Sequence, residues 1–113
     1  MDKPRITIDE FSKIEVKIGT VQSAERVPET DKLLRLMVNF AEEAGPRQII
    51  SGIAAYVTDP ASLVGRQLAF VTNLEPRTLR GLESNGMLFA VGSGESFAFL
   101  TPDREVPPGT SAH

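Results

Sequence analysis

Cysteine and tryptophan are absent from this 113-residue chain, and its single histidine is the last residue, His113. Without cysteine the chain has no disulfide, no thiolate metal ligand and no cysteine nucleophile. One terminal histidine excludes a histidine-based triad and leaves a zinc site without its usual ligands. No glycine-rich phosphate loop with its lysine is present either. We therefore predict that the chain holds no catalytic site, no cofactor and no metal.

Long apolar runs are also missing. No segment approaches the roughly 20 apolar residues that span a bilayer, and residues 1–5 lead into no signal-peptide core. Repeats and low-complexity tracts are absent, and 113 residues suit one domain. We predict a single cytoplasmic domain over residues 1–113 with no membrane association.

Positive charge is in short supply, since 12 basic residues face 15 acidic ones and the net charge is −3. Most nucleic-acid-binding domains are basic, so this balance counts against such a role. The distribution is uneven, however. Residues 32–87 carry six basic and five acidic groups, whereas both flanking segments are acidic. Because binding depends on the local field at a groove, the middle of the chain stays a candidate binding region.

The first half of the chain predicts a helical turn and three strands. Thr7 and Glu10 have capping-box spacing, which indicates a short helical turn over residues 8–13. Alternation of Ile14, Val16 and Ile18 with charged residues then predicts a long strand, bent where the phase breaks at Gly19. Alternation over residues 34–40 predicts a second strand, and residues 47–53 form a third.

The second half predicts a short helix and further strands. Residues 59–65 have an N-cap, a proline at the first helical position and a closing glycine, which indicate one or two helical turns. A fourth strand over 68–72, a long connection over 73–85 and a fifth strand over 86–91 follow. Residues 97–100 form a short strand extension. Five short strands with a helix between the third and fourth predict an all-β, five-stranded barrel of the OB type.

The aromatic residues are few, seven in all, and most are expected to fill the core. Phe40, Phe70 and Phe89 continue apolar strand faces and are predicted to be buried. Tyr56, just before the helix, is predicted to pack rather than to stack on a ligand. A row of aromatics along the second and third strands is missing, so base-by-base reading of RNA is not expected.

OB barrels bind their ligands on the face of strands 2 and 3 and with the loops 1–2 and 4–5. Most of the basic groups of residues 32–87 fall at those places, and Arg66 alone lies outside them. Arginine offers a planar fork of donors that matches phosphate oxygens. Strand surfaces also carry charge for solubility, so the pattern favours phosphate binding only together with the predicted topology.

Three segments then carry a resemblance to a known family. They are DKLLRL at 31–36, RQIISGIA at 47–54 and NLEPRTLRGLESNGM at 73–87. They resemble the tRNA-binding domain that ends many bacterial methionyl-tRNA synthetases and also occurs as a free-standing protein. The similarity extends over about residues 6–109.

The resemblance implies a non-catalytic, homodimeric OB domain that grips tRNA by its shape and backbone and assists a partner synthetase. Any ligase chemistry would then lie on residues outside this chain. The positions that match the family's tRNA-contacting surface are Lys32, Arg35, Arg47, Ser51, Asn73, Arg77, Arg80, Ser84 and Met87. The apolar segment 97–100 is a candidate dimer interface, and it is equally a candidate for edge-strand core.

A second reading stays open at this stage. Export chaperones of the CsaA type are similar in fold, and a protein-interaction module would bind unfolded or partner protein with weak salt dependence. The arginines clustered at the expected groove favour the tRNA reading over this alternative.

Overall fold

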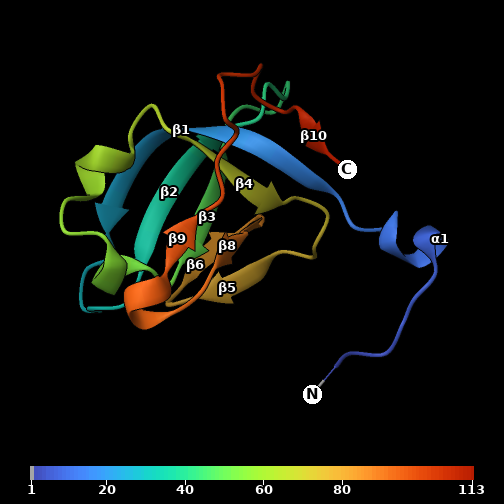
Figure 1. The fold of residues 1–113 in the computed structure, drawn as a ribbon. Helices are drawn as coiled ribbons and strands as arrows, with labels where there is room; N and C mark the ends of the chain where they lie inside the picture. Colours follow the sequence, from blue (N-terminus) through green and yellow to red (C-terminus); the bar gives the residue numbers. More distant parts are fainter. Residues whose placement is uncertain (1) are drawn as a thin grey trace.

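A computed structural model describes residues 2–113, and its centre is an all-β barrel (Figure 1). The elements follow one another as α1 (Ile8–Phe11), β1 (Val16–Arg26), β2 (Leu34–Asn39), β3 (Arg47–Ser51), η1 (Ala54–Tyr56), η2 (Pro60–Leu63), β4 (Gln67–Val71), β5 (Arg77–Leu79), β6 (Leu82–Ser84), β7 (Met87–Leu88), β8 (Ala90–Val91), η3 (Gly94–Ser96), β9 (Ala98–Phe99) and β10 (Ser111–Ala112). The main sheet has the order β3-β2-β1-β4-β7, and β10 also pairs with β1. The predicted five-stranded OB barrel is confirmed.

Strand β1 is long enough to serve both halves of the barrel. Residues 16–20 pair with β4 and residues 20–26 pair with β2. The predicted bend at Gly19 takes another form, because the register shift lies between Val21 and Ser23. Gly19 is required by close packing: a Cβ there would overlap the side chains of Val38 and Phe40.

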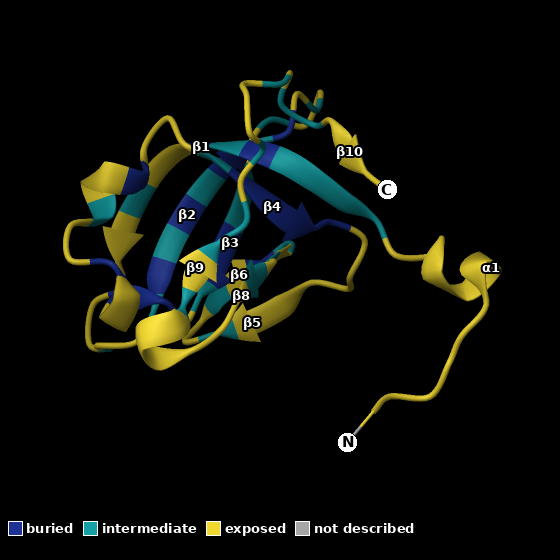
Figure 2. Cartoon of the chain, in the orientation of Figure 1, coloured by how far each residue is buried: buried dark blue, intermediate teal, exposed yellow. Residues whose placement is uncertain are grey.

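The core lies inside this sheet (Figure 2). Leu34, Leu36 and Val38 of β2 are fully buried, as their alternation predicts. Phe70 packs edge-on against Phe40 with ring centroids 5.5 Å apart, so the prediction that both are core is confirmed. The prediction for Phe89 is wrong, since this side chain is 44% exposed.

The main sheet leaves a gap between β3 and β7 that side chains and loops close. The Asn85 N–H donates to the Gln48 carbonyl at 2.8 Å, and the Ile50 N–H donates to Ser84 Oγ at 2.9 Å. Ser84 Oγ donates in turn to the Gly86 carbonyl at 3.1 Å. The edge groups of β3 are thereby satisfied, which a buried strand edge requires.

The predicted short helix within residues 59–65 is confirmed as the 3-10 helix η2, whose N-cap is the Asp59 carboxylate on the Ala61 N–H. The prediction for the connection after β4 needs correction. The predicted connection 73–85 contains the hairpin β5–β6, and its two turn residues are Arg80 and Gly81 with φ of 52° and 78°. Positive φ at both positions is typical of a type I′ turn, and an arginine at the first position hides that signal in the sequence.

The N-terminal segment stands away from the barrel (Figure 1). Thr7 caps α1 by accepting the Glu10 N–H, as the spacing predicts. Asn73 anchors the segment that follows, because its side chain accepts from the Glu15 N–H at 2.9 Å and donates to the Lys13 carbonyl at 2.6 Å. Over residues 2–113, no helix has the length and apolar character needed to cross a membrane.

Candidate nucleic-acid interface

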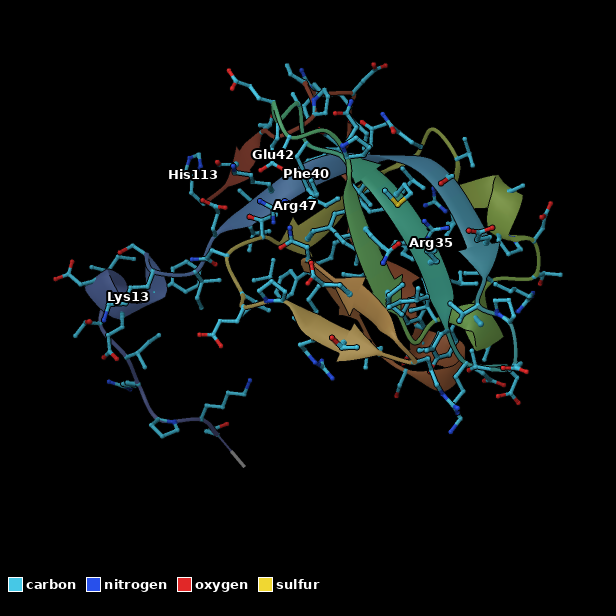
Figure 3. The ribbon with its side chains drawn as sticks, turned by 180° about the vertical axis from the view of Figure 1, so that it is seen from behind. Lys13, Arg35, Phe40, Glu42, Arg47 and His113 are labelled. Carbon is cyan, nitrogen blue, oxygen red and sulfur yellow. The ribbon has the colours of Figure 1, made fainter. Side chains whose placement is uncertain are left out.

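Arg35 lies at the centre of the outer face of β2 and β3 (Figure 3). Its Nε donates to Gln48 Oε1 at 2.7 Å, and Gln48 Nε2 donates to the Glu83 carbonyl of β6 at 2.8 Å. Arg35 Nη1 also contacts Glu25 Oε1 of β1 at 2.6 Å. The guanidinium is therefore held between two neighbouring strands, and a chain of hydrogen bonds connects it to the β5–β6 hairpin.

The hairpin carries two further arginines beside this face. Arg77 pairs with Ser84 in the ladder, and Arg80 occupies the turn. Both side chains are exposed, and neither has an ion-pair partner within residues 2–113. A short, closed turn restricts their backbone, so both charges are presented from a defined position.

Lys32 belongs to the loop between β1 and β2 and is exposed. Two hydrogen bonds of the Lys32 backbone order the loop: its N–H donates to Thr30 Oγ1 at 3.2 Å, and its carbonyl accepts from the Ala54 N–H at 3.1 Å. The loop is thereby fastened to η1 at the end of β3. The ammonium group of Lys32 is left for solvent or a ligand.

Arg47 is placed differently from what its position at the start of β3 suggested. It stands opposite Val38, a fully buried core residue, so its side chain enters the end of the barrel instead of the outer face. Its Nε and Nη2 each contact a Glu42 carboxylate oxygen at 2.8 Å, and Nη1 donates to the Thr72 carbonyl at 2.7 Å. Its Cζ lies 5.4 Å from the centroid of the Phe40 ring (Figure 3).

Three other predicted contact residues also have structural partners. Ser84 is 5% exposed and closes the barrel against Ile50, while Asn73 holds residues 13–15. Ser51 stands opposite Leu34 at the end of β3 and is half-buried. Their predicted contact with tRNA stays a prediction, and the structure assigns Ser84 and Asn73 a scaffold role.

Met87 remains on the outside. It is paired with Val71 across β4 and β7 and is 43% exposed. With Arg77 and Ile50 it lines a small cavity of about 50 Å³ beneath the hairpin. The structure therefore brings Met87 and Arg77 together, and it separates both from the internal Arg47.

Sequence reasoning missed the residues that orient these arginines. Gln48 and Glu25 touch Arg35, and Glu42 holds Arg47. Knowledge of the register of β2 against β3 would have shown that Arg47 points inward, because Arg47 stands opposite the buried Val38. However, Ile49 and Ile50 are consecutive apolar residues, so the β3 pattern does not show which face is inner.

The barrel end is an electrostatic cluster. Hydrogen bonds from Arg47, with Coulomb attraction from Arg47 and Lys17, hold the pKa of Glu42 below its usual value against partial burial. The hydrogen bond to Glu42 likewise raises the pKa of Arg47. Thr72 Oγ1 donates to Glu15 Oε1 at 2.6 Å at the same end. Glu42 and Arg47 are therefore both charged at neutral pH.

Comparison with known proteins finds that residues 16–111 match the family model described as a putative tRNA binding domain. The methionine–tRNA ligase of Methanocorpusculum labreanum is 49% identical over 108 residues, covering 96% of this chain and 15% of that protein. The ligase of Thermotoga maritima is 47% identical over 104 residues, covering 92% of this chain and 16% of that protein. The chain thus spans about 15% of the length of the curated relatives that it matches.

Solved structures show the same likeness. A MetRS-related protein from Pyrococcus horikoshii superposes with a TM-score of 0.88 at 34% identity, covering 98% of this chain and 100% of that one. The chaperone CsaA from Bacillus anthracis superposes with a TM-score of 0.82 at 28% identity, covering 97% and 100%. This chain is similar to both in the whole barrel.

The Glu42–Arg47 pair yields a stability prediction. The pKa of Glu42 is lower in the folded chain than in the unfolded chain, where it is roughly 4.3. The pair therefore contributes fully to the free energy of unfolding above that unfolded pKa, and this contribution is lost as pH falls through the folded-state pKa. We expect Glu42→Gln to lower the free energy of unfolding by about 1–2 kcal/mol at pH 7 and by much less at pH 3. Urea unfolding at both pH values measures this. The exposed neighbour provides the control variant Glu43→Gln, and equal losses for both variants would contradict the role of the pair.

Proposed function

This chain belongs to the tRNA-binding domain family, and we propose that it binds tRNA with the outer face of β2, β3 and the β5–β6 hairpin. This surface, the basic face, carries Lys32, Arg35, Arg77 and Arg80. The fold supports the proposal, because OB barrels take nucleic acids on strands 2–3 between the loops 1–2 and 4–5. Arg47, Asn73 and Ser84 act in this proposal through the shape of the barrel, and Ser51 remains a proposed contact at the end of β3.

One observation carries the proposal most directly. Arg77 and Arg80 are exposed on the β5–β6 hairpin and have no ion-pair partner within residues 2–113. Arg47, by contrast, is engaged by the Glu42 carboxylate at 2.8 Å and is not available to a ligand in the same way. An unpaired guanidinium on a fixed backbone can form charge-assisted bonds to phosphate oxygens without first breaking an internal ion pair. These two arginines are therefore the primary phosphate contacts in this proposal.

The surface suits recognition of shape and backbone. Its apolar members are Met37 and Met87, and no aromatic residue of β2 or β3 is available for stacking. Phosphate contacts position a nucleic acid but carry no sequence information. We expect binding that is broad across tRNA species, with folded tRNA favoured because its phosphates are fixed in space.

The domain acts for a synthetase in this proposal and performs no chemistry itself. The relatives that it matches are methionine–tRNA ligases, of which it spans about 15%. Within residues 2–113 no three His, Cys, Asp or Glu side chains gather into a possible metal site. Tethering a tRNA-binding module to a synthetase raises the effective concentration of tRNA at the catalytic part. We therefore propose that the protein acts in the cytoplasm, beside its synthetase.

A homodimer forms part of the proposal. The segment 97–100 is a poorer interface than the sequence suggested, because Phe97 and Phe99 are half-buried against the core. Phe89, which follows β7, is instead 44% exposed. The N-terminal segment adds exposed apolar groups on α1 (Figure 2), and apolar patches of this kind mark interfaces.

Equilibrium binding of mixed cellular tRNA, titrated against salt, tests the tRNA proposal. Four phosphate contacts predict a log–log slope of about −3 to −4. Arg80→Ala should weaken binding by about 1–2 kcal/mol and reduce the slope by about one, while the domain stays folded. Arg104→Ala, on the C-terminal segment, should leave the affinity unchanged. Equal binding of an unstructured RNA of the same length would contradict shape recognition, and no binding at low salt would favour a protein-interaction module.

Glu25 should act against binding. Its carboxylate holds Arg35 at 2.6 Å and would lie beside a phosphate bound there. We expect Glu25→Gln to raise tRNA affinity about threefold to tenfold at low salt, and less at high salt, because one competing charge is removed. Glu105→Gln removes an equal charge outside this face and should change little. The same gain in both variants would show a general charge effect and contradict a local one.

Light scattering at micromolar concentration tests the dimer. We expect twice the 12.3 kDa chain mass for the natural sequence and a monomer for the double variant Ile8→Ser, Phe11→Ser. The helix α1 contributes no buried residue to the monomer, so the variant should keep its urea midpoint. A monomeric natural chain would exclude the homodimer.

A further inference from the structure

Three of the seven aromatic side chains gather around the 3-10 helices, apart from the basic face. Tyr56 of η1 stacks in parallel on Phe97, with ring centroids 4.2 Å apart and an angle of 5°. Phe97 meets Phe99 edge-on at 5.2 Å. The Tyr56 hydroxyl accepts from the Gly94 N–H at 3.4 Å, which links the ring to η3. The tyrosine ring is thus fixed in orientation while 42% of the residue remains exposed.

A hollow of about 340 Å³ opens beside this ring. Tyr56 and Phe99 contribute its aromatic wall, and Thr58, Asp59 and Ser62 contribute polar groups. Phe97 does not line the hollow, because it occupies one face of Tyr56 from behind. The volume is at the lower end of the roughly 300–1,000 Å³ typical of small-ligand sites.

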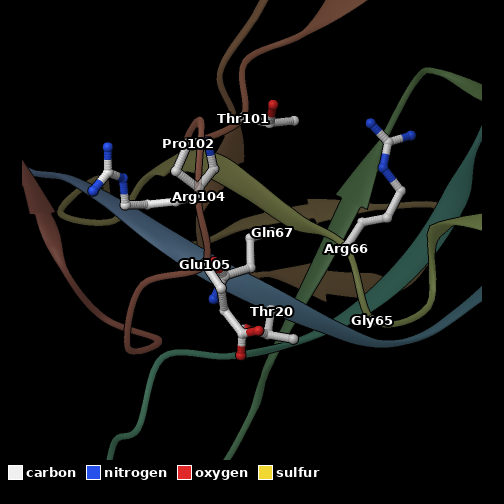
Figure 4. A pocket seen from close by; sticks show the side chains of 8 residues that line it. All are labelled: Thr20, Gly65, Arg66, Gln67, Thr101, Pro102, Arg104 and Glu105. Carbon is white, nitrogen blue, oxygen red and sulfur yellow. Dashed lines mark hydrogen bonds between the residues drawn. The ribbon is translucent and has the colours of Figure 1, made fainter.

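Arg66 completes the hollow. Its Cζ lies 5.1 Å from the centroid of the Phe99 ring, and its side chain is exposed. Arg66 also lines a neighbouring depression with Arg104 and Glu105, but Figure 4 shows its side chain extending away from both. The guanidinium therefore belongs to the aromatic hollow, where it stands as the positive group.

We propose that this hollow, the aromatic–arginine pocket, binds one unpaired nucleotide of an RNA. A flat ring that is held by stacking on Phe97 and is partly exposed at the hollow suits a stacking platform, which accepts any base because every base has a π-face. Arg66 supplies the phosphate contact. Asp59 uses Oδ1 to cap η2 and keeps a second carboxylate oxygen, which accepts from an N–H on the edge of the base.

The pocket is a second contact, beyond the basic face proposed above. It lies on η1, η2 and β9, whereas Arg35, Arg77 and Arg80 lie on β2 and the β5–β6 hairpin. The face around Arg35 holds phosphates of folded RNA and lacks aromatics, while the pocket has aromatics and one exposed arginine. The two surfaces therefore suit different parts of an RNA, a structured backbone and an unpaired end or loop.

The composition supplies a clean readout, because Tyr56 is the only tyrosine and tryptophan is absent. Intrinsic fluorescence of the whole chain consequently reports on this pocket alone. We expect tetra-adenylate to quench it in a saturable manner. Inorganic phosphate at equal charge should leave it unchanged, since phosphate alone offers no base to stack.

Variants separate stacking from charge. Tyr56→Ala should weaken binding of labelled tetra-adenylate about tenfold, measured by anisotropy, because stacking on one aromatic is lost. Tyr56→Phe keeps the ring and should bind within about twofold. Arg66→Gln should weaken binding about threefold to tenfold, and Arg104→Gln, its exposed neighbour, should not. Tyr56→Phe and Arg66→Gln keep the proposal testable if Tyr56→Ala fails to fold.

The outcomes distinguish this pocket from the tRNA proposal. The pocket is supported if tetra-adenylate quenches the fluorescence saturably, and if Arg66→Gln weakens this quenching while Arg80→Ala leaves it unchanged. This result is independent of whether tRNA binds the basic face. Salt-sensitive tRNA binding without quenching by tetra-adenylate overturns the pocket and leaves the basic face standing. Quenching by an unfolded polypeptide but not by tetra-adenylate overturns the nucleotide reading in favour of a peptide.

Discussion

The ion pair between Arg47 and Glu42 at the end of the barrel is the contact on which the remaining geometry depends. Arg47 opens β3, Glu42 belongs to the loop after β2, and the Arg47 guanidinium also binds the carbonyl of Thr72 after β4. One side chain thereby joins three segments that are distant in sequence. Beneath it the Phe40 ring separates these charges from the core. Since an arginine left there without Glu42 would be a partly buried, unpaired charge, the two residues are required together.

The closed barrel explains how an acidic chain can present a group of basic side chains on one face. Charges in the interior end are neutralised in pairs, and the arginines of the β5–β6 hairpin are left without partners within residues 2–113. Arg35 is intermediate, because Gln48 orients it while Glu25 competes for it. The net charge of −3 is therefore a poor guide to the field at this surface, which is set by a few fixed guanidinium groups.

The connections between the barrel strands carry several of the exposed side chains that the proposals use. The segment between β3 and β4 closes the core with Leu63 and also presents Tyr56 and Arg66 at the surface. The segment between β4 and β7 closes the barrel through Ser84 and also presents Arg77 and Arg80. In both cases a buried anchor fixes the exposed group a few residues away, which is the usual way a scaffold positions binding residues.

The sequence by itself determined the order of the five barrel strands, the place of the helical segment and most of the core, but not the β5–β6 hairpin or β10. Period-2 alternation in β2 and capping chemistry at Thr7 and Asp59 are local properties, so they can be read from neighbouring residues. Only the tertiary structure decided the direction of Arg47, the exposure of Phe89 and the hairpin turn at Arg80. Each depends on the register of a strand against a distant partner or on a backbone conformation unusual for its residue type. Local patterns carry no information on either, because burial is set by what the rest of the chain brings to that face.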